Sequence, residues 1–242
     1  RRNERIQALV IKGTPQGESN KLTALFLADG RMINAVAHGA RKPASRFGAS
    51  LEPGTVIRAE LRYGTSQDAL ATLSDGAILN SHQGLKQTLN GMGILFDFLG
   101  LLQYVCRCAG GDAELYRRSV TLLDHADQAQ DDLSGILPMV RGAVLLHLGR
   151  MPDWTCCSLC RAPSPERVSL HGVYCSRCAA LNRGETRPVA AAVAGLADRI
   201  ARGEIPLGVQ PWGQLDDVFD WMLEASGLRQ ENNRGYTTHA GR

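Results

Sequence analysis

Short apolar runs separated by turn residues fill the first third of the chain. The runs cover residues 5–12, 21–28, 31–38, 56–63 and 69–73. Asp29-Gly30, between the second and third runs, is a signal for a two-residue hairpin turn. Residues 56–63 alternate cleanly between apolar and polar side chains, as a strand with one buried face does. Five short strands within ~75 residues predict a small β-barrel or sandwich.

From residue 81 onward the apolar positions follow helical spacing. Leu85, Leu89, Met92, Phe96 and Leu99 form one stripe, which a second set widens: Leu95, Phe98, Leu102 and Val105. A helix that is apolar over so much of its circumference is predicted to lie at the centre of a core. Polar residues interrupt the stretch 85–105, so we expect a buried helix there and no membrane span.

Further helices are predicted from Asp112, a good N-cap, through Leu123, and over residues 136–148, 190–201 and 212–226. The predicted class is therefore α+β, with a five-stranded barrel at residues 1–80. A helical domain follows in two parts, 81–150 and 189–228, with a cysteine module inserted at 151–188 and a mobile polar tail at 229–242. The five-stranded member of the small barrels is the OB-fold, which commonly binds oligonucleotides, although strand number alone fits a barrel without a ligand equally well.

Positive charge is concentrated in the predicted barrel. Residues 1–80 hold 11 Lys and Arg against 7 Asp and Glu, whereas the rest of the chain is nearly balanced and the total is +3. A local basic surface attracts polyanions, but an excess of this size also fits an ordinary solvated surface. No secretory signal is recognisable, which favours the cytoplasm.

Two Cys-x-x-Cys pairs, Cys157/Cys160 and Cys175/Cys178, stand fourteen residues apart. Two such turns can bring four thiolates together as a tetrahedron, the arrangement that Zn²⁺ prefers. The alternative, a redox-active pair, usually occurs once and at the start of a helix. We therefore predict one structural zinc ion, with Cys156 and His171 as neighbours that could compete as ligands.

The usual catalytic motifs are missing from the sequence. No Lys follows a Gly, so no Walker A loop exists, and no H-x-E, H-E-x-x-H or G-x-S-x-G is present. A zinc ion held by four thiolates leaves no open position for water or substrate. The chain is therefore predicted not to be an enzyme.

Three segments resemble the RecO family of bacterial recombination mediators. They are HGARKPASRFGASLEPG at residues 38–54, LLHLGRMPDWTCCSLC at 145–160 and VSLHGVYCSRC at 168–178. The resemblance extends from Ile6 to about Ser226 and implies an N-terminal OB-fold and a helical domain with a zinc module. It also implies binding of single- and double-stranded DNA without sequence specificity and annealing of complementary strands. The implied partners are RecR, single-strand-binding protein and, indirectly, RecA, in a cytoplasmic, nucleoid-associated setting.

The loop at residues 39–50 has the composition expected for phosphate contacts, since it combines small residues with Arg41, Lys42 and Arg46 and carries no acid. The other predicted DNA contacts lie on strands: Lys12, Lys21, Arg58 and Arg62. Phe47 and Tyr63 are the candidates for base stacking, whereas Phe26 is expected inside the barrel. So few aromatic residues favour binding to the DNA backbone.

The resemblance further implies that the acidic, apolar-ended tail of single-strand-binding protein docks on the helical domain. Such a tail needs an apolar groove with Arg beside it, and Arg117, Arg118 and Arg141 are the candidates. Arg141 is the first choice, because it lies within a strongly apolar helix, where an exposed charge needs a reason. Two other functions remain open: a zinc-ribbon interaction scaffold without annealing activity, and a metalloenzyme with an open zinc site.

Overall fold

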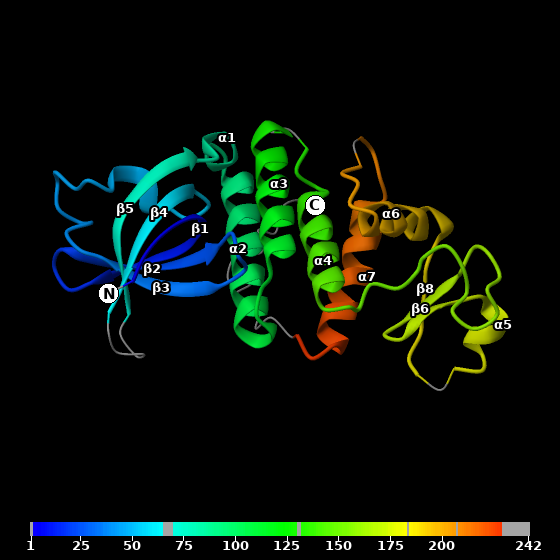
Figure 1. The fold of residues 1–242 in the computed structure, drawn as a ribbon. Helices are drawn as coiled ribbons and strands as arrows, with labels where there is room; N and C mark the ends of the chain where they lie inside the picture. The colour runs from blue at the N-terminus through cyan, green and yellow to red at the C-terminus, as the bar shows by residue number, and fades with distance from the viewer. Residues whose placement is uncertain (1, 65–69, 130–131, 183, 207, 229–242) are drawn as a thin grey trace.

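The computed structural model describes residues 2–64, 70–129, 132–182, 184–206 and 208–228. Two predictions fall outside these ranges: the tail at residues 229–242, and Ala69 as the first residue of the fifth strand. The molecule is elongated (Figure 1), with the barrel at one end, a block of helices in the middle and the four-cysteine module at the other end. The predicted α+β fold class is thus confirmed.

The barrel closes through five strands in the order β1-β2-β3-β5-β4. Their bounds are β1 (Arg2–Gln16), β2 (Asn20–Leu27), β3 (Met32–Ala37), β4 (Val56–Tyr63) and β5 (Ala71–Asn80). β3 and β5 pair in parallel, and the other neighbours pair antiparallel. β5 continues well past Leu73, where the apolar pattern stops, because polar residues also pair with β4: Asp75 lies opposite Glu60.

Both faces are buried at residues 8–11 of β1 and 23–27 of β2, which explains the continuous apolar sequence there. Ala8 and Val10 point into the barrel, whereas Leu9 and Ile11 pack against the helices on its outside. Phe26 on β2 also faces the helices, where its ring meets Tyr116 edge-on with 5.5 Å between the centroids. It is buried as predicted, but outside the barrel interior.

The helical block follows the barrel directly. Its helices are α1 (Gln83–Lys86), α2 (Leu89–Ala109), α3 (Ala113–Ala129), α4 (Ile136–His147), α6 (Ala191–Ala201) and α7 (Trp212–Ala225). Asp112 is the N-cap of α3 as predicted, since its carboxylate accepts the Leu115 N–H at 2.7 Å. Gly30 in the β2–β3 turn packs against this cap so closely that a side chain there would overlap the Asp112 backbone.

α2 is the core helix of the block, but only part of the face predicted to be buried is buried. Leu95, Phe98, Leu102 and Val105 are buried, whereas Leu89 is 91% and Phe96 52% exposed. The helix is apolar nearly all round, so its sequence does not reveal which side meets the neighbouring elements. Among the described residues, α2 is also the one helix that is long and apolar enough to cross a membrane, with a hydropathy of 1.4. Its buried side is typical of the core of a folded domain.

The four-cysteine module is more regular than its turn-rich sequence suggests. It contains a small sheet in the order β7-β6-β8, formed by β6 (Arg167–Ser169), β7 (Gly172–Tyr174) and β8 (Arg187–Pro188), and the short helix α5 (Ser176–Ala179). Strands of two or three residues leave no periodic signal in a sequence, which is why the pattern missed them. The Arg187 guanidinium lies 4.8 Å from the ring centre of Trp221 and joins the module to α7.

Candidate metal centre and nucleic-acid interface

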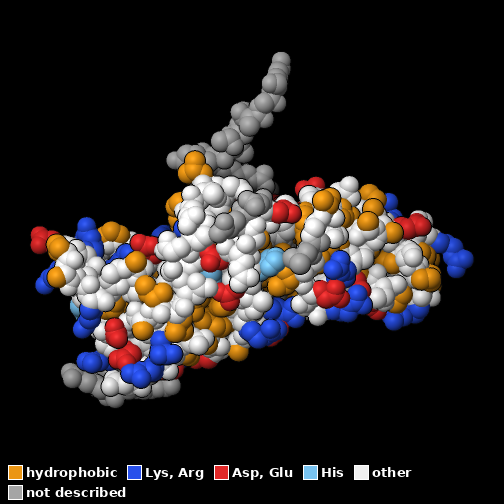
Figure 2. Space-filling view, turned by 90° about the horizontal axis from the view of Figure 1, so that it is seen from above, with side chains coloured by type: hydrophobic (Ala, Val, Ile, Leu, Met, Phe, Trp, Pro, Cys, Tyr) orange, Lys and Arg blue, Asp and Glu red, His pale blue; other side chains and the backbone are white. Residues whose placement is uncertain are grey.

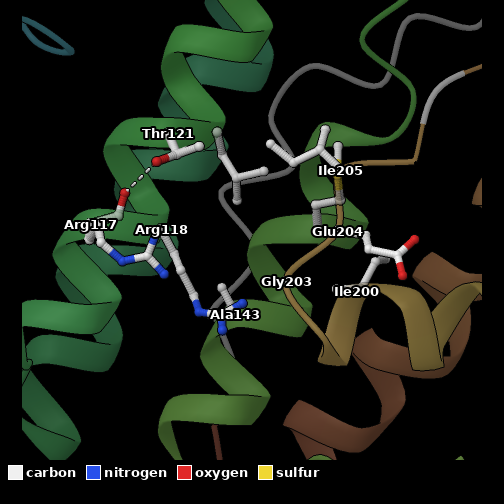
Figure 3. A pocket seen from close by; sticks show the side chains of 10 residues that line it. Arg117, Arg118, Thr121, Ala143, Ile200, Gly203, Glu204 and Ile205 are labelled. Carbon is white, nitrogen blue, oxygen red and sulfur yellow. Dashed lines mark hydrogen bonds between the residues drawn. The ribbon is translucent and has the colours of Figure 1, made fainter.

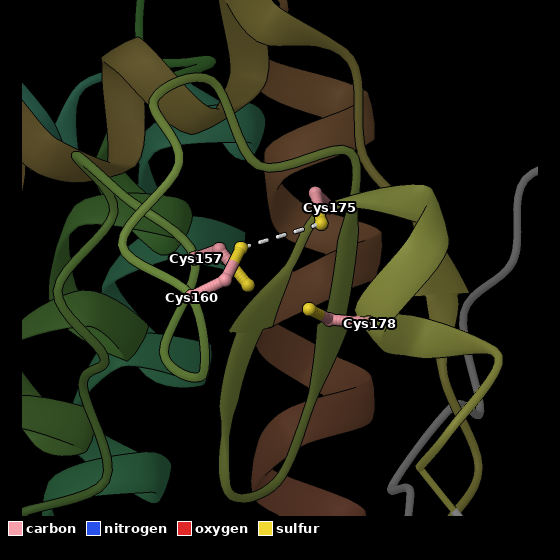
Figure 4. A group of neighbouring side chains, drawn as sticks. All are labelled: Cys157, Cys160, Cys175 and Cys178. Atoms are coloured by element: carbon pink, nitrogen blue, oxygen red, sulfur yellow. Dashed lines mark hydrogen bonds between the residues drawn. The ribbon is translucent and has the colours of Figure 1, made fainter.

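The two cysteine pairs converge in space as their spacing predicts. The sulfur atoms of Cys157, Cys160, Cys175 and Cys178 all lie within 4.8 Å of one another (Figure 4), and Cys160 Sγ is 3.7 Å from Cys175 Sγ. A tetrahedral zinc site with Zn–S bonds of ~2.3 Å requires sulfur atoms about 3.8 Å apart. The four thiols therefore fit a zinc ion.

Two tight turns present these sulfur atoms. In the first, the Cys157 N–H donates to Ala162 O at 2.8 Å and the Arg161 N–H donates back to Cys157 O at 2.9 Å. Arg161 adopts a φ of +62°, which closes this turn. In the second, Cys175 precedes α5, and its carbonyl accepts the Ala179 N–H at 2.9 Å.

Within the cluster, the pKa values of Cys157 and Cys178 are shifted in opposite directions. Burial raises the pKa of Cys157, but the backbone N–H groups of Cys160, Cys175 and Leu159 outweigh it and lower the value to about 6. Hydrogen bonding to the Cys160 and Cys175 thiols, with burial, raises the pKa of Cys178 to about 12. A divalent cation would bind all four cysteines as thiolates and release their protons.

The competing ligands considered from sequence lie outside the cluster. Cys156 Sγ is 3.6 Å from an Asp153 carboxylate oxygen and is not part of the four-sulfur group. His171 is exposed, and its backbone N–H donates to Ser169 Oγ at 3.0 Å. The first cysteine pair is thus Cys157 and Cys160.

Basic side chains gather on what we call the loop face, formed by the loop at residues 38–55 and the β1–β2 hairpin. Arg41 ties the two segments together, because its backbone N–H donates to Ser19 O at 3.0 Å and its Nη1 donates to Gly17 O at 2.8 Å. Lys21 Nζ donates to Leu51 O at 3.2 Å. Lys42 and Arg46 on the same loop are exposed.

Of the other three predicted DNA contacts, Arg58 and Arg62 lie on β4, outside this face, whereas Lys12 lies on β1 within the β1–β2 hairpin. Arg58 and Arg62 are exposed on β4, but Glu60 lies between them, forms an ion pair with Arg5 and faces Asp75 across the sheet. Lys12 is exposed on β1, next to a register shift in its pairing with β2. Figure 2 likewise shows acidic and basic side chains interspersed along one long side of the molecule. On the loop face the basic side chains outnumber the exposed Glu18 and Glu52, so this face is the better candidate for phosphate contacts.

Base stacking by Phe47, considered from sequence, is contradicted by its burial. Phe47 is 3% exposed within the barrel core, and Arg46 covers it with 5.1 Å between the guanidinium carbon and the ring centre. Because Phe47 lies in a polar loop, its sequence context does not indicate that its ring fills the barrel interior. Tyr63 is half-buried, and its hydroxyl donates to Glu4 Oε2 at 2.8 Å.

A groove crosses the helical block between α3, α4 and the end of α6 (Figure 3). Its lining residues are Arg117, Arg118, Thr121, Leu122, Met139, Ala143, Ile200, Gly203, Glu204 and Ile205. Two of the three predicted partner-binding arginines, Arg117 and Arg118, are thus brought together beside apolar side chains. We refer to it as the α3–α4–α6 groove.

Arg141, the third predicted arginine, does not line this groove. It is 15% exposed and forms ion pairs with Asp216 and with Asp220 of α7, the latter at 3.3 Å. Burial raises the pKa of Asp216 despite the opposing effect of Arg141. This ion pair gives Arg141 a role in joining α4 to α7.

Comparison with known proteins now fixes the family. The model described as Recombination protein O N terminal matches residues 2–82, and the model described as Recombination protein O C terminal matches residues 101–233. The chain belongs to the RecO family.

Several relatives carry the name DNA repair protein RecO. The one from Anaeromyxobacter dehalogenans (strain 2CP-C) is 29% identical over 221 residues, which cover 82% of this chain and 79% of the relative. That from Exiguobacterium sibiricum is 27% identical over 178 residues, covering 72% and 70%, and that from Myxococcus xanthus is 25% identical over 193 residues, covering 78% of each. The family resemblance inferred from the sequence is confirmed.

Sequence reasoning missed part of the groove in this RecO-family chain. Gly203 and Ile205 come from the segment after α6 and line the groove, and Gly203 lies beside Arg118 only through the fold. Glu114 was also overlooked, although its spacing of three and four residues from Arg117 and Arg118 is a recognisable helix signal.

Proposed function

We propose that this RecO-family protein is a DNA repair and recombination mediator without a catalytic centre, acting in the cytoplasm on the nucleoid. It binds single- and double-stranded DNA through its barrel without sequence specificity and anneals complementary strands. With RecR, it helps to load RecA onto DNA coated by single-strand-binding protein. The observation that carries the proposal is the match of both family models, which together cover most of the chain.

The loop face is the proposed DNA contact. Arg41, Lys42 and Arg46 extend from a loop that its backbone hydrogen bonds hold against the β1–β2 hairpin, and Lys21 lies beneath it. Such an arrangement suits phosphates, which are bound by charge and carry no sequence information. Lys12, Arg58 and Arg62 are proposed as outer contacts along the path of the strand. With Phe47 buried, the barrel binds the DNA backbone in preference to the bases.

The metal is proposed to be one structural Zn²⁺ on Cys157, Cys160, Cys175 and Cys178. Bound there, it would supply a fixed cross-link between two turns, because four thiolates complete a tetrahedral shell. The fit of the sulfur–sulfur distances supports this assignment.

The α3–α4–α6 groove is the proposed docking site for the tail of single-strand-binding protein. The groove combines aliphatic side chains of α4 and α6 with two arginines, so it complements a peptide that is acidic and ends in an apolar residue with a free carboxylate. Because Arg141 is paired with Asp216 and Asp220, the proposal rests on Arg117 and Arg118.

Reversing the charge of Arg41, Lys42 and Arg46 to glutamate is expected to weaken binding to all DNA sequences alike. The logarithm of affinity should also fall less steeply with the logarithm of salt concentration, by about one unit for each phosphate that the protein no longer neutralises. Fluorescence anisotropy with labelled oligonucleotides, over a series of salt concentrations, measures both effects.

A matched control reverses Arg107, Arg150 and Arg202, which are exposed elsewhere, and thus makes the same change in net charge. This control should retain most of the affinity. Equal weakening in both triple variants would mean that only total charge matters, and unchanged binding by the loop variant would move the DNA site elsewhere. A chain that binds no DNA at all would favour the zinc-ribbon scaffold.

A further inference from the structure

The rim of the α3–α4–α6 groove already holds a carboxylate. Glu114 accepts hydrogen bonds from Arg117 Nε at 2.7 Å, from Arg117 Nη2 at 2.6 Å and from Arg118 Nε at 2.7 Å. A guanidinium can hold a carboxylate at two points through its Nε and one Nη. On Arg117, Glu114 occupies both of these donors, and on Arg118 it occupies Nε alone.

Glu114 is charged at neutral pH. The hydrogen bond from Arg117 has the largest effect on its pKa. Together with the bond from Arg118 it outweighs the opposing effect of burial and lowers the pKa to about 2. Glu114 thus neutralises one of the two arginine charges at this rim, whereas Glu204, which also lines the groove, is paired with Arg199 and Arg202. Glu114 therefore offsets part of the attraction that the two arginines exert on an anionic peptide.

The far end of Arg118 is the part that stays open. Among the described residues, its Nη1 and Nη2 donate no hydrogen bond, and they lie 3.4 and 3.6 Å from the position of a Cβ added to Gly203. Figure 3 shows this guanidinium beside Ala143 and Gly203, across the groove from its own helix. The Arg118 side chain is 23% exposed, against 63% for Arg117, so Arg118 is the arginine held within the groove.

We propose that Glu114 is an internal competitor for the anionic peptide that docks in this groove. It occupies Arg117 and the Nε of Arg118, lowers the affinity of the groove, and leaves an incoming carboxylate the Nη1/Nη2 end of Arg118. The inference rests on the docking function proposed above. It adds that Arg118 is the main anchor and that Glu114 sets how tightly the partner is held.

Displacement of Glu114 is physically accessible. Its side chain is 51% exposed, so it can turn into water without becoming a buried unpaired charge. Exposed ion pairs contribute little to stability, which limits what the ligand must overcome. If Glu114 stays in place, its carboxylate and that of the ligand share the same two arginines and repel each other.

The test measures binding of a short labelled peptide, rich in aspartate and ending in phenylalanine with a free carboxylate, to the intact zinc-loaded chain. Glu114→Gln should tighten binding roughly three- to fivefold, the size expected when an exposed ion pair is released. Arg118→Gln should weaken it by about tenfold or more, because the main anchor is removed. Arg117→Gln should cost less than about twofold in the wild-type background but roughly threefold in the Glu114→Gln background, where Arg117 has become available.

Glu204→Gln is the matched control, since Glu204 also lines the groove but pairs with Arg199 at 2.8 Å. It should raise affinity less than Glu114→Gln does, because its carboxylate is held by Arg199 and Arg202 and occupies neither groove arginine. An equal gain in both variants would show a general charge effect and overturn the proposal. So would an unchanged or weaker affinity in Glu114→Gln while the wild type binds. If neither wild type nor Glu114→Gln binds the peptide, the docking function itself fails, whereas binding by Glu114→Gln alone supports the competitor.

Discussion

Replacing Cys175 by serine is expected to remove the metal and unfold the four-cysteine module while the barrel stays folded. Besides the metal, the module is held by Trp154, Val168 and Val173, which pack into the core of the helical block, and by a small cluster of its own. Its own buried cluster consists of Cys157, Tyr174, Cys178 and Ala179, and its strands are two or three residues long. Zinc-finger peptides gain roughly 10–16 kcal/mol of apparent folding energy from the ion, far more than such a cluster can replace.

Elemental analysis of the purified chains measures this effect directly. Wild type should carry close to one zinc ion per chain and Cys175→Ser almost none, and limited proteolysis should cut the variant within residues 153–188. Cys156→Ser is the control, because its sulfur lies beside the cluster but outside it, and it should retain the metal. Full zinc content in Cys175→Ser would reject the ligand set, and a different metal in the wild type would reject zinc.

Replacing His82 by alanine is expected to destabilise the whole fold by roughly 2 kcal/mol, because the buried Gly54 carbonyl loses its partner and the ring leaves a cavity. Asp124 contributes less, since it is 44% exposed and keeps its hydrogen bond from Asn80. His82 is 0% exposed at the junction between the barrel and α1. Its Nδ1 lies 2.6 Å from Gly54 O and its Nε2 2.9 Å from Asp124 Oδ1, so one ring joins the end of the loop face to α3. Its backbone has a φ of +48°, an uncommon value for a residue other than glycine.

Urea denaturation of the zinc-loaded chain, followed by circular dichroism, measures the change in free energy of unfolding. His38→Ala removes an exposed histidine from the same region and should leave that free energy nearly unchanged. A value for His82→Ala within about 0.5 kcal/mol of the wild type would be typical of an ordinary surface position and would show that the junction does not depend on this ring.

Much of this architecture is visible in the sequence because it depends on local patterns. Strand and helix periodicity follow from which side of an element is buried, and the Asp29-Gly30 turn and the Asp112 cap act within a few residues of themselves. The metal centre is predictable for the same reason. Two cysteines on one tight turn face one point, and two such turns need only meet.

What the sequence conceals depends on contacts between distant segments. Phe47 fills the barrel from a polar loop, and the exposed side of α2 is set by where the barrel and α4 pack. Arg141 meets Asp216, and Arg118 reaches Gly203, across long intervals of sequence. These pairings carry no periodic or spacing signal, and the choice between a docking arginine and a structural one therefore requires the fold.

Strand annealing tests the central claim most directly. Two complementary oligonucleotides, one labelled with a donor and the other with an acceptor fluorophore, are mixed with the intact zinc-loaded chain, with and without single-strand-binding protein. The account predicts that the chain speeds duplex formation in both cases and that reversing Arg41, Lys42 and Arg46 to glutamate removes most of the acceleration. A folded, zinc-loaded wild-type chain that leaves the rate at its spontaneous value would contradict it.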